Sequence, residues 1–195
     1  MGRIKKPIPV KLFIGMISPK TKLADRVKVT LKRKFGEIDL ESNTIDFDFT
    51  DYYKKEIGKN LVRQFIGFGK LIDPCRLASI KIFTNKLEEE FARKDKSRTI
   101  NLDPGYITES NLILATTKGF QHRIYLNRGI FAEVTLKYQK GDFRPYDWTY
   151  PDYKTEDYRN FFKKLREIYR KQVTKKTVGT PCCEKSLSGC KVSPI

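Results

Sequence analysis

The order of apolar patterns along the chain is the feature that most constrains its fold. An apolar run at residues 9–17 is followed by a helical stripe at 21–35, where apolar residues recur every four positions. A second apolar run at 61–68 precedes a helical pattern that opens at Pro74. Consecutive strand patterns then lead to a last helical pattern near Thr155. This order predicts an α+β fold: a single mixed β-sheet packed by about three main helices, with a C-terminal hairpin and a terminal helix.

Short apolar or alternating segments predict the remaining strands. They lie at residues 44–49, 98–102, 111–115, 122–126 and 130–138. Asp103, Pro104 and Gly105 are strong turn formers, so a turn is expected between the strands at 98–102 and 111–115. Gly129 lies in the connection of the hairpin formed by the last two strands, where a left-handed conformation is commonly required.

The 195 residues suit one domain with short tails. Residues 1–7 are expected to form a flexible basic N-terminus, and residues 8–173 a single α+β domain. Residues 174–195 have no apolar periodicity, which predicts a disordered tail. Three of the four cysteines lie in this tail: Cys182, Cys183 and Cys190. They could bind a soft metal, but a fourth ligand at regular spacing is missing, so an unstructured tail is favoured.

Cysteine usage and hydropathy bear on location. The cysteines do not form a disulfide framework for a chain of this length, which indicates a reducing compartment. No apolar run approaches the roughly 20 residues that a membrane helix needs. We therefore expect a cytoplasmic protein without a membrane partner.

The net charge of +17, from 40 lysines and arginines against 23 acidic residues, predicts an anionic partner. The excess persists in the body of the chain when the basic termini are set aside. Such a field attracts phosphates, anionic metabolites, nucleic acid or acidic lipid. The alternative is a charged surface that serves only solubility or life at high temperature.

The densest polar cluster is ATTKGFQHR at residues 115–123, which follows an apolar strand. Thr116 and Thr117 offer hydroxyls, and Lys118 and Arg123 offer positive charge. His122 is the only histidine, and histidine is the side chain that ordinarily titrates near neutral pH. Together these groups suit a phosphate or carboxylate. The alternative is a polar hairpin with solvated charges.

Glu133 is unusual because it lies in a strand-like run between Ala132 and Val134. A carboxylate is costly to bury without a partner. Its face of the sheet is solvated, or it pairs with Lys118 or Arg123, or it binds a ligand or metal. We favour pairing.

Two further groups of residues could line a site. Asp46, Asp48 and Asp51 form an acidic patch that could hold a divalent cation, although a solvated face is the more common arrangement. Tyr106 or Asp103 could line a site at the end of a strand. The segment WTYPDY at 148–153 could stack a base, but a segment that clamps the last helix onto the core is favoured.

The chain resembles a family of small prokaryotic proteins catalogued as a domain of unknown function, some of which are labelled GTP-binding protein. The resemblance covers roughly residues 8–171 and rests on the segments PVKLFIGMI, DFTDYYKKEIG, NLDPGY, LATTKGFQHRIYL, GIFAEVTLKY and WTYPDY. The label implies nucleotide binding. A phosphate loop is missing, and Phe120 stands where a guanine-specificity motif would need Asp two residues after Lys118. A conventional GTPase mechanism is therefore not expected.

The preferred hypothesis is a protein that binds a nucleotide or another phosphorylated metabolite. In an enzyme, His122 would act as general acid or base beside Glu133, and Lys118 and Arg123 would hold the anion. The other predicted ligand-binding residues are Thr116, Thr117, Asp51 and Tyr106. The alternatives are an RNA-binding module that uses the basic faces of 21–35 and 155–171, and a non-catalytic partner-binding protein. The sequence assigns no cofactor.

Overall fold

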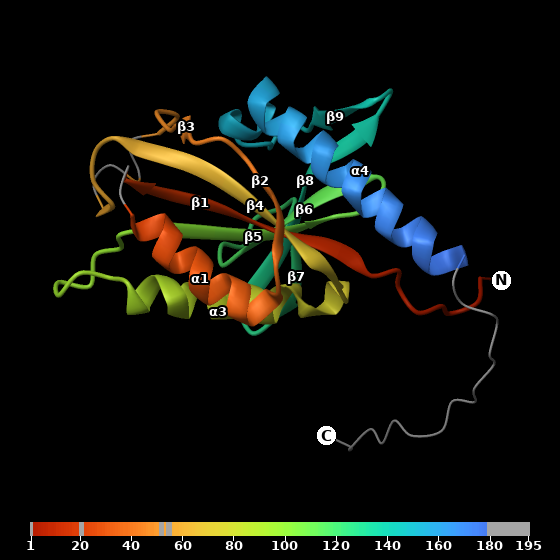
Figure 1. The fold of residues 1–195 in the computed structure, drawn as a ribbon, viewed down its shortest axis with the longest axis horizontal. Coiled ribbons are helices and arrows are strands. Elements are labelled where there is room, and N and C mark those ends of the chain that lie inside the picture. Colours follow the sequence, from red (N-terminus) through yellow and green to blue (C-terminus); the bar gives the residue numbers. More distant parts are fainter. Residues whose placement is uncertain (1, 20–21, 51–52, 54–55, 179–195) are drawn as a thin grey trace, which may run out of the picture.

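The structure, a computed structural model, describes residues 2–19, 22–50, 53 and 56–178. Within these residues nine strands form one sheet in the order β2-β4-β1-β5-β6-β8-β7, with β3 paired to β4 and β9 to β8 (Figure 1). All the pairings are antiparallel. The strands are β1 (Val10–Pro19), β2 (Ile38–Glu41), β3 (Ile45–Asp46), β4 (Leu61–Ile72), β5 (Asn101–Ile107), β6 (Asn111–Thr116), β7 (Ile124–Asn127), β8 (Ile130–Gln139) and β9 (Asp142–Pro145). The predicted α+β fold is confirmed, but the sheet is antiparallel in all its described pairings and not mixed as predicted.

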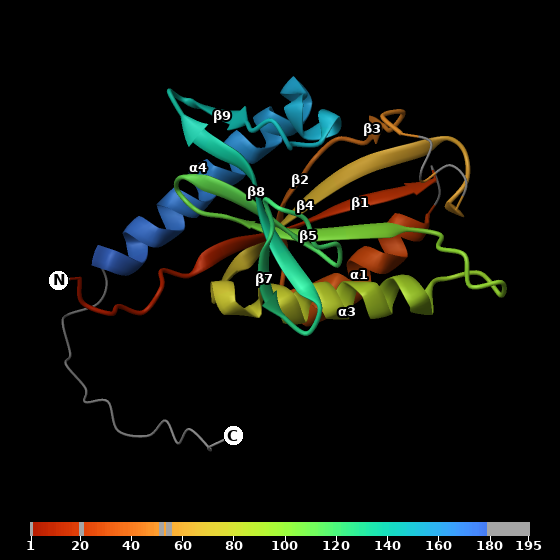
Figure 2. The ribbon, with the colours of Figure 1, turned by 180° about the vertical axis from the view of Figure 1, so that it is seen from behind.

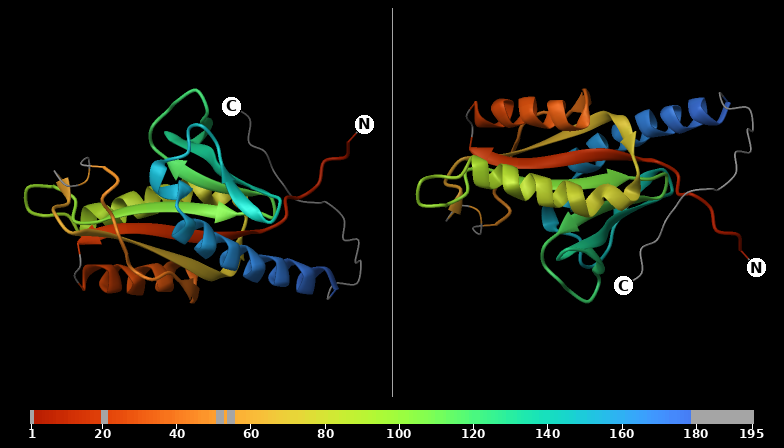
Figure 3. Two further views of the ribbon diagram at one scale, coloured as in Figure 1. Left: turned by 90° about the horizontal axis from the view of Figure 1, so that it is seen from above. Right: turned by 90° about the horizontal axis from the view of Figure 1, so that it is seen from below.

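Helices cover both faces of the sheet. The α-helices are α1 (Leu23–Phe35), α3 (Leu77–Glu90) and α4 (Glu156–Val178), and single 3₁₀ turns, η1 (Pro74–Arg76) and η2 (Pro151–Lys154), precede the last two. Figures 1 and 2 show α4 on one side of the sheet and α1 and α3 on the other. Seen from above and below, α1 and α3 run lengthwise along the strands β1 and β5 (Figure 3).

The alternation of side chains along β1 builds the two apolar cores. Val10, Leu12, Ile14 and Met16 point to one face and pack with the inner faces of α1 and α3. Phe13 points to the other face, where its ring lies 5.0 Å from the ring of Phe162 in α4. Because β1 is buried on both faces, it appears in the sequence as an apolar run in which Lys11 is the one charged residue of positions 9–17.

Several element boundaries differ from the predicted ones. The strand expected at 44–49 is reduced to Ile45–Asp46, and β4 continues to Ile72. The short strands β2 and β9 were not predicted. Helix α4 continues to Val178, and residues 179–195, which hold the tail cysteines, lie outside the described residues. Within the described chain, no helix combines the length and apolar character needed to cross a bilayer.

The predicted turn at Asp103-Pro104-Gly105 is wrong, because these residues lie inside β5. The turn comes after β5, where the backbone N–H of Thr108 donates to the carbonyl of Asn111. Gly105 is needed here because a Cβ atom would overlap the carbonyl oxygen of Ile113 and the ring of Phe13. The glycine thus permits a close approach of β6 rather than a change of direction.

Candidate ligand-binding site

The sheet opens between β5 and β6. Strand β5 pairs with β1 from Asn101 to Ile107, but with β6 only from Gly105 to Ile107. At Leu102, before the strands meet, two side chains of α3 take the place of a neighbouring strand. The Glu88 carboxylate accepts the backbone N–H of Leu102 at 2.7 Å, and Lys81 Nζ donates to its carbonyl at 2.8 Å.

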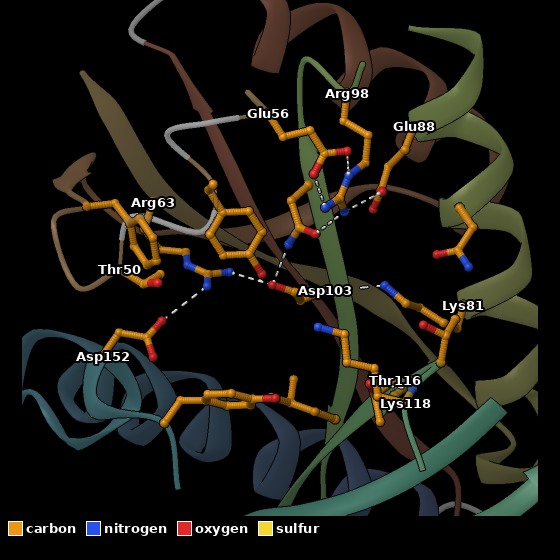
Figure 4. A pocket seen from close by; sticks show the side chains of 18 of the residues that line it. Thr50, Glu56, Arg63, Lys81, Glu88, Arg98, Asp103, Thr116, Lys118 and Asp152 are labelled. Atoms are coloured by element: carbon orange, nitrogen blue, oxygen red, sulfur yellow. Dashed lines mark hydrogen bonds and ion pairs between the residues drawn. The ribbon is translucent and has the colours of Figure 1, made fainter. Parts of the chain in front are cut away.

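A pocket of about 1190 Å³ lies at this opening. Its walls come from α3, from the start of β5, from residues 47–56 as far as they are described, from the end of β6 and from residues 150–153. Figure 4 shows Lys81, Asp103 and Lys118 around the same space. This volume lies somewhat above the range of about 300–1,000 Å³ that is typical of small-molecule sites.

Arg63 joins two walls of the pocket. It is 3% exposed, and it donates from Nη1 to Asp103 at 2.9 Å and from Nη2 to Asp152 at 3.1 Å (Figure 4). Burial alone would raise the pKa of Asp103, but the charges of Arg63 and Lys81 overcome it and lower that pKa. Burial raises the pKa of Asp152 in spite of the same arginine. The two carboxyls therefore differ in acidity although they share one cation.

Arg98 organises the end of the pocket beside α3. It holds Glu56 through two hydrogen bonds, of 2.7 Å from Nε and 2.6 Å from Nη2. Its Nη1 donates to Asn101 at 2.9 Å and to Glu88 at 3.3 Å. The hydrogen bonds from Arg98 lower the pKa of Glu56, whereas burial raises the pKa of Glu88. This arginine ties the segment before β4 to both α3 and β5.

Glu133 is paired, as the sequence interpretation favoured. It is 2% exposed and lies opposite Leu114 of β6. Its Oε2 accepts Arg123 Nε at 2.9 Å and lies 3.1 Å from His122 Nε2. The His122 ring stacks on Trp148, with centroids 5.1 Å apart and planes 11° apart. The loop that bears the histidine therefore folds back onto β8.

Arg123 has each of its nitrogens engaged. Besides Glu133, it donates from Nη1 to the carbonyl of Lys118 at 3.0 Å and from Nη2 to the hydroxyl of Tyr150 at 2.7 Å. The guanidinium thus connects three segments around the pocket. It fixes the loop after β6 instead of presenting its donors to the pocket.

The structure brings some of the predicted site residues together and separates others. Thr116, Thr117, Lys118 and Glu133 line the pocket. The side chain of Tyr106 packs instead against the apolar clusters beneath α1 and α3. Asp51 lies outside the described residues. From the aromatic segment, Tyr150 and Tyr153 line the pocket, and Tyr153 also packs against α4.

Other predicted features have a more ordinary environment. Asp46 and Asp48 are exposed, and among the described residues no group of three or more potential metal ligands comes together. The basic faces of α1 and α4 lie on opposite sides of the sheet. Part of their charge is paired, as in Lys28 with Glu41 at 2.8 Å. The two helices therefore do not form one continuous basic surface.

Sequence reasoning missed Arg63, Lys81 and Glu88. Arg63 lies in an apolar strand and is as unusual there as Glu133 is in β8. Lys81 and Glu88 are two turns apart on α3 and both are buried, so they form a polar stripe beside its apolar face. A search for charged residues within apolar patterns would have found Arg63 and the α3 stripe.

Comparison with known proteins places the chain in one family. Neither a curated protein nor a solved structure matches it. A family model matches residues 8–169, which include the sheet, the pocket and most of α4. The chain therefore belongs to the family described as Domain of unknown function DUF4416.

Proposed function

We propose that this protein binds a nucleotide or a related phosphorylated metabolite in the pocket between β5 and β6. The observation that carries the proposal is that Lys81 from α3 and Lys118 from the loop after β6 line one pocket, together with exposed aromatic rings. An anionic group and an aromatic base would each meet matching chemistry there.

The lysines supply the anion-binding part. Lys81 Nζ uses one donor on the carbonyl of Leu102, and an ammonium group has three. Lys118 lies beside the hydroxyls of Thr116 and Thr117, which also line the pocket. Ammonium and hydroxyl groups are donors suited to phosphate oxygens.

The aromatic residues supply the stacking part. Phe49 and Tyr150 line the pocket and are 43% and 44% exposed. Aromatic rings that stay accessible in a pocket are suited to stacking on a base, whatever its identity. Tyr150 is also held in place by Arg123, so its ring has a defined position.

His122, Arg123 and Glu133 have a positioning role in this proposal. They bind one another and fix the carbonyl of Lys118, which sets the course of the loop that carries the lysine. This assignment revises the expectation that Arg123 contacts the anion and that His122 and Glu133 act on it.

The test is calorimetric titration with the four common ribonucleoside mono- and triphosphates, with thermal unfolding as a parallel readout. Lys118→Ala and Lys81→Met should each weaken binding about tenfold or more, because each removes a charged donor. Lys86→Ala, an exposed lysine of the same helix outside the pocket, is the matched control and should bind like the wild type. Absence of binding by the wild type to the whole panel would reject the proposal.

A further inference from the structure

The charge of the pocket is not simply positive. Its described lining holds about as many carboxylates as cations once Arg123, which pairs with Glu133 from outside the lining, is counted, so an anion alone would meet repulsion as well as attraction. The carboxylates are Glu56, Glu88, Glu89, Asp103, Glu133 and Asp152, and the cations are Arg63, Lys81, Lys96, Arg98 and Lys118. A ligand that fits must therefore bring hydrogen-bond donors in addition to its anionic group.

Asp103 is the carboxylate best placed to accept such a donor. Its Oδ2 is occupied by Arg63 at 2.9 Å and Asn101 at 2.8 Å. Its Oδ1 lies 4.0 Å from Lys81 Nζ, a distance too long for a hydrogen bond. Among the described residues no hydrogen bond reaches this oxygen. An acceptor and a charged donor thus face the pocket side by side.

That arrangement suits a hydroxyl group. A hydroxyl donates one hydrogen bond and accepts others, so it can donate to Asp103 Oδ1 and accept from Lys81 at the same time. A water molecule could do the same, but a ligand hydroxyl is held there by the rest of the ligand. In unrelated nucleotide-binding sites, carboxylates accept hydrogen bonds from the hydroxyls of ribose in this way.

Asn85 extends the same wall. It lies one turn after Lys81 on α3 and lines the pocket. Within the part of the chain that the structure describes, its carboxamide makes no hydrogen bond. An amide offers both donors and an acceptor, so it can serve a second, neighbouring hydroxyl.

We propose that Lys81, Asn85 and Asp103 form a wall that binds the adjacent hydroxyls of a ribose. The inference rests on the proposed function and narrows it: the phosphorylated ligand is a ribose compound, and its deoxy counterpart is rejected. In this narrower proposal Lys81 binds the sugar rather than the phosphate, Lys118 holds the phosphate, and the ring of Tyr150 stacks on the base.

The experiment measures the preference for ribose by calorimetry on the full chain. Ribose 5-phosphate is compared with 2-deoxyribose 5-phosphate, and each of the four ribonucleoside monophosphates with its 2′-deoxy form. The wild type should bind the ribose form about tenfold or more tightly. A deoxy analogue lacks a hydroxyl, so the polar groups of the site that bind this hydroxyl lose their hydrogen-bond partner. Asp103→Asn and Asn85→Ala should bring this ratio close to one, and Lys86→Ala should leave it unchanged.

The outcomes separate the two proposals. Equal binding of ribose and deoxyribose forms by the wild type overturns the inference and leaves the proposed function standing. A ribose preference that survives in Asn85→Ala and in a folded Asp103→Asn also overturns it, because another part of the pocket then reads the sugar. Should Asp103→Asn unfold, Asn85→Ala decides alone, since Asn85 makes no hydrogen bond to the described chain. Failure of every compound to bind rejects the proposed function itself.

Discussion

Two arginines near the pocket, the buried Arg63 in its lining and the half-buried Arg123 behind the loop after β6, perform different tasks. Arg63 neutralises two carboxylates, Asp103 and Asp152, that come from distant parts of the chain. Arg123 neutralises only Glu133, and its other two nitrogens donate hydrogen bonds to a backbone carbonyl and a tyrosine hydroxyl. The first arginine therefore stabilises buried charge, whereas the second mainly sets the course of a loop.

The difference lies in what remains when each arginine is lost. Without Arg63, Asp103 would keep only Asn101 and the more distant Lys81, and the carboxyl of Asp152 would stay buried. Without Arg123, Glu133 would keep His122 and the hydroxyl of Thr135. Loss of Arg63 should thus appear as instability, and loss of Arg123 as altered binding.

Arg63→Met should have the largest effect on stability. It leaves the buried Asp152 and the half-buried Asp103 without their cation, and loss of one partner of a buried ion pair typically costs about 3–5 kcal/mol. Urea unfolding at pH 7 measures it. A loss below about 1 kcal/mol would show that the network around Arg63 is not a main source of stability.

Acid should weaken the same network. Because the pKa of Asp103 is lowered in the folded protein, its stabilising contribution is complete above its unfolded pKa of about 3.9 and is lost as pH falls through the folded pKa. The free energy of unfolding of the wild type should exceed that of Asp103→Asn at pH 6, and the gap should narrow below pH 4. Asp152, with its raised pKa, acts in the opposite direction, so the comparison with Asp103→Asn isolates Asp103. A gap that widens in acid would contradict the assignment.

Arg123→Met should cost less, about 1.5–3 kcal/mol, the usual range for hydrogen bonds to a charged group. Its larger effect should be on ligand affinity, because the loop that bears Lys118 loses the hydrogen bond from Arg123 that holds its backbone. Arg128→Met, on the exposed turn between β7 and β8, is the matched control and should change neither quantity. If Arg123→Met destabilises the fold as much as Arg63→Met, the division of tasks is wrong.

The smallest effects distinguish two tyrosines. Tyr150→Phe removes the hydroxyl that accepts from Arg123 and should cost about 0.5–1.5 kcal/mol. Tyr153 is buried, and its hydroxyl has no hydrogen-bond partner among the described residues. Tyr153→Phe should therefore be neutral or slightly stabilising. Thermal unfolding of both variants in parallel compares their losses of stability. Equal losses would contradict the predicted difference between the two hydroxyls.

The parts of the fold that were predicted correctly are those with strong periodicity. Helix α1 buries one face and therefore has an apolar stripe, and strand β1 buries both faces and therefore has an apolar run interrupted by Lys11. Strands β2 and β9 were missed because each has only four residues, several of them exposed. Asp103, Pro104 and Gly105 were predicted as a turn because these residue types are typical of turns. Pro and Gly also occur in strands where a ladder hydrogen bond is missing or a neighbouring backbone comes close, and β5 is such a strand.

The site was predictable only in part. Glu133 was singled out because a carboxylate in an apolar strand needs a partner, and its partners lie in the predicted loop. The other side of the pocket depends on α3 lying beside β5, a tertiary contact that the sequence pattern does not encode. Asp103 was considered at the end of a strand. Lys81, which lies 4.0 Å from it, and Asn85, which lines the same pocket, were assigned to a helix without a role.

The way in which Glu88 and Lys81 satisfy Leu102 has a kinetic consequence. These hydrogen bonds occupy the backbone N–H and carbonyl of Leu102, through which β5 could otherwise pair with β6. The gap between the two strands therefore stays open in the free protein. A small molecule can then reach this part of the pocket without β6 first separating from β5. Its association rate should rise linearly with concentration and show no plateau from a slow opening step.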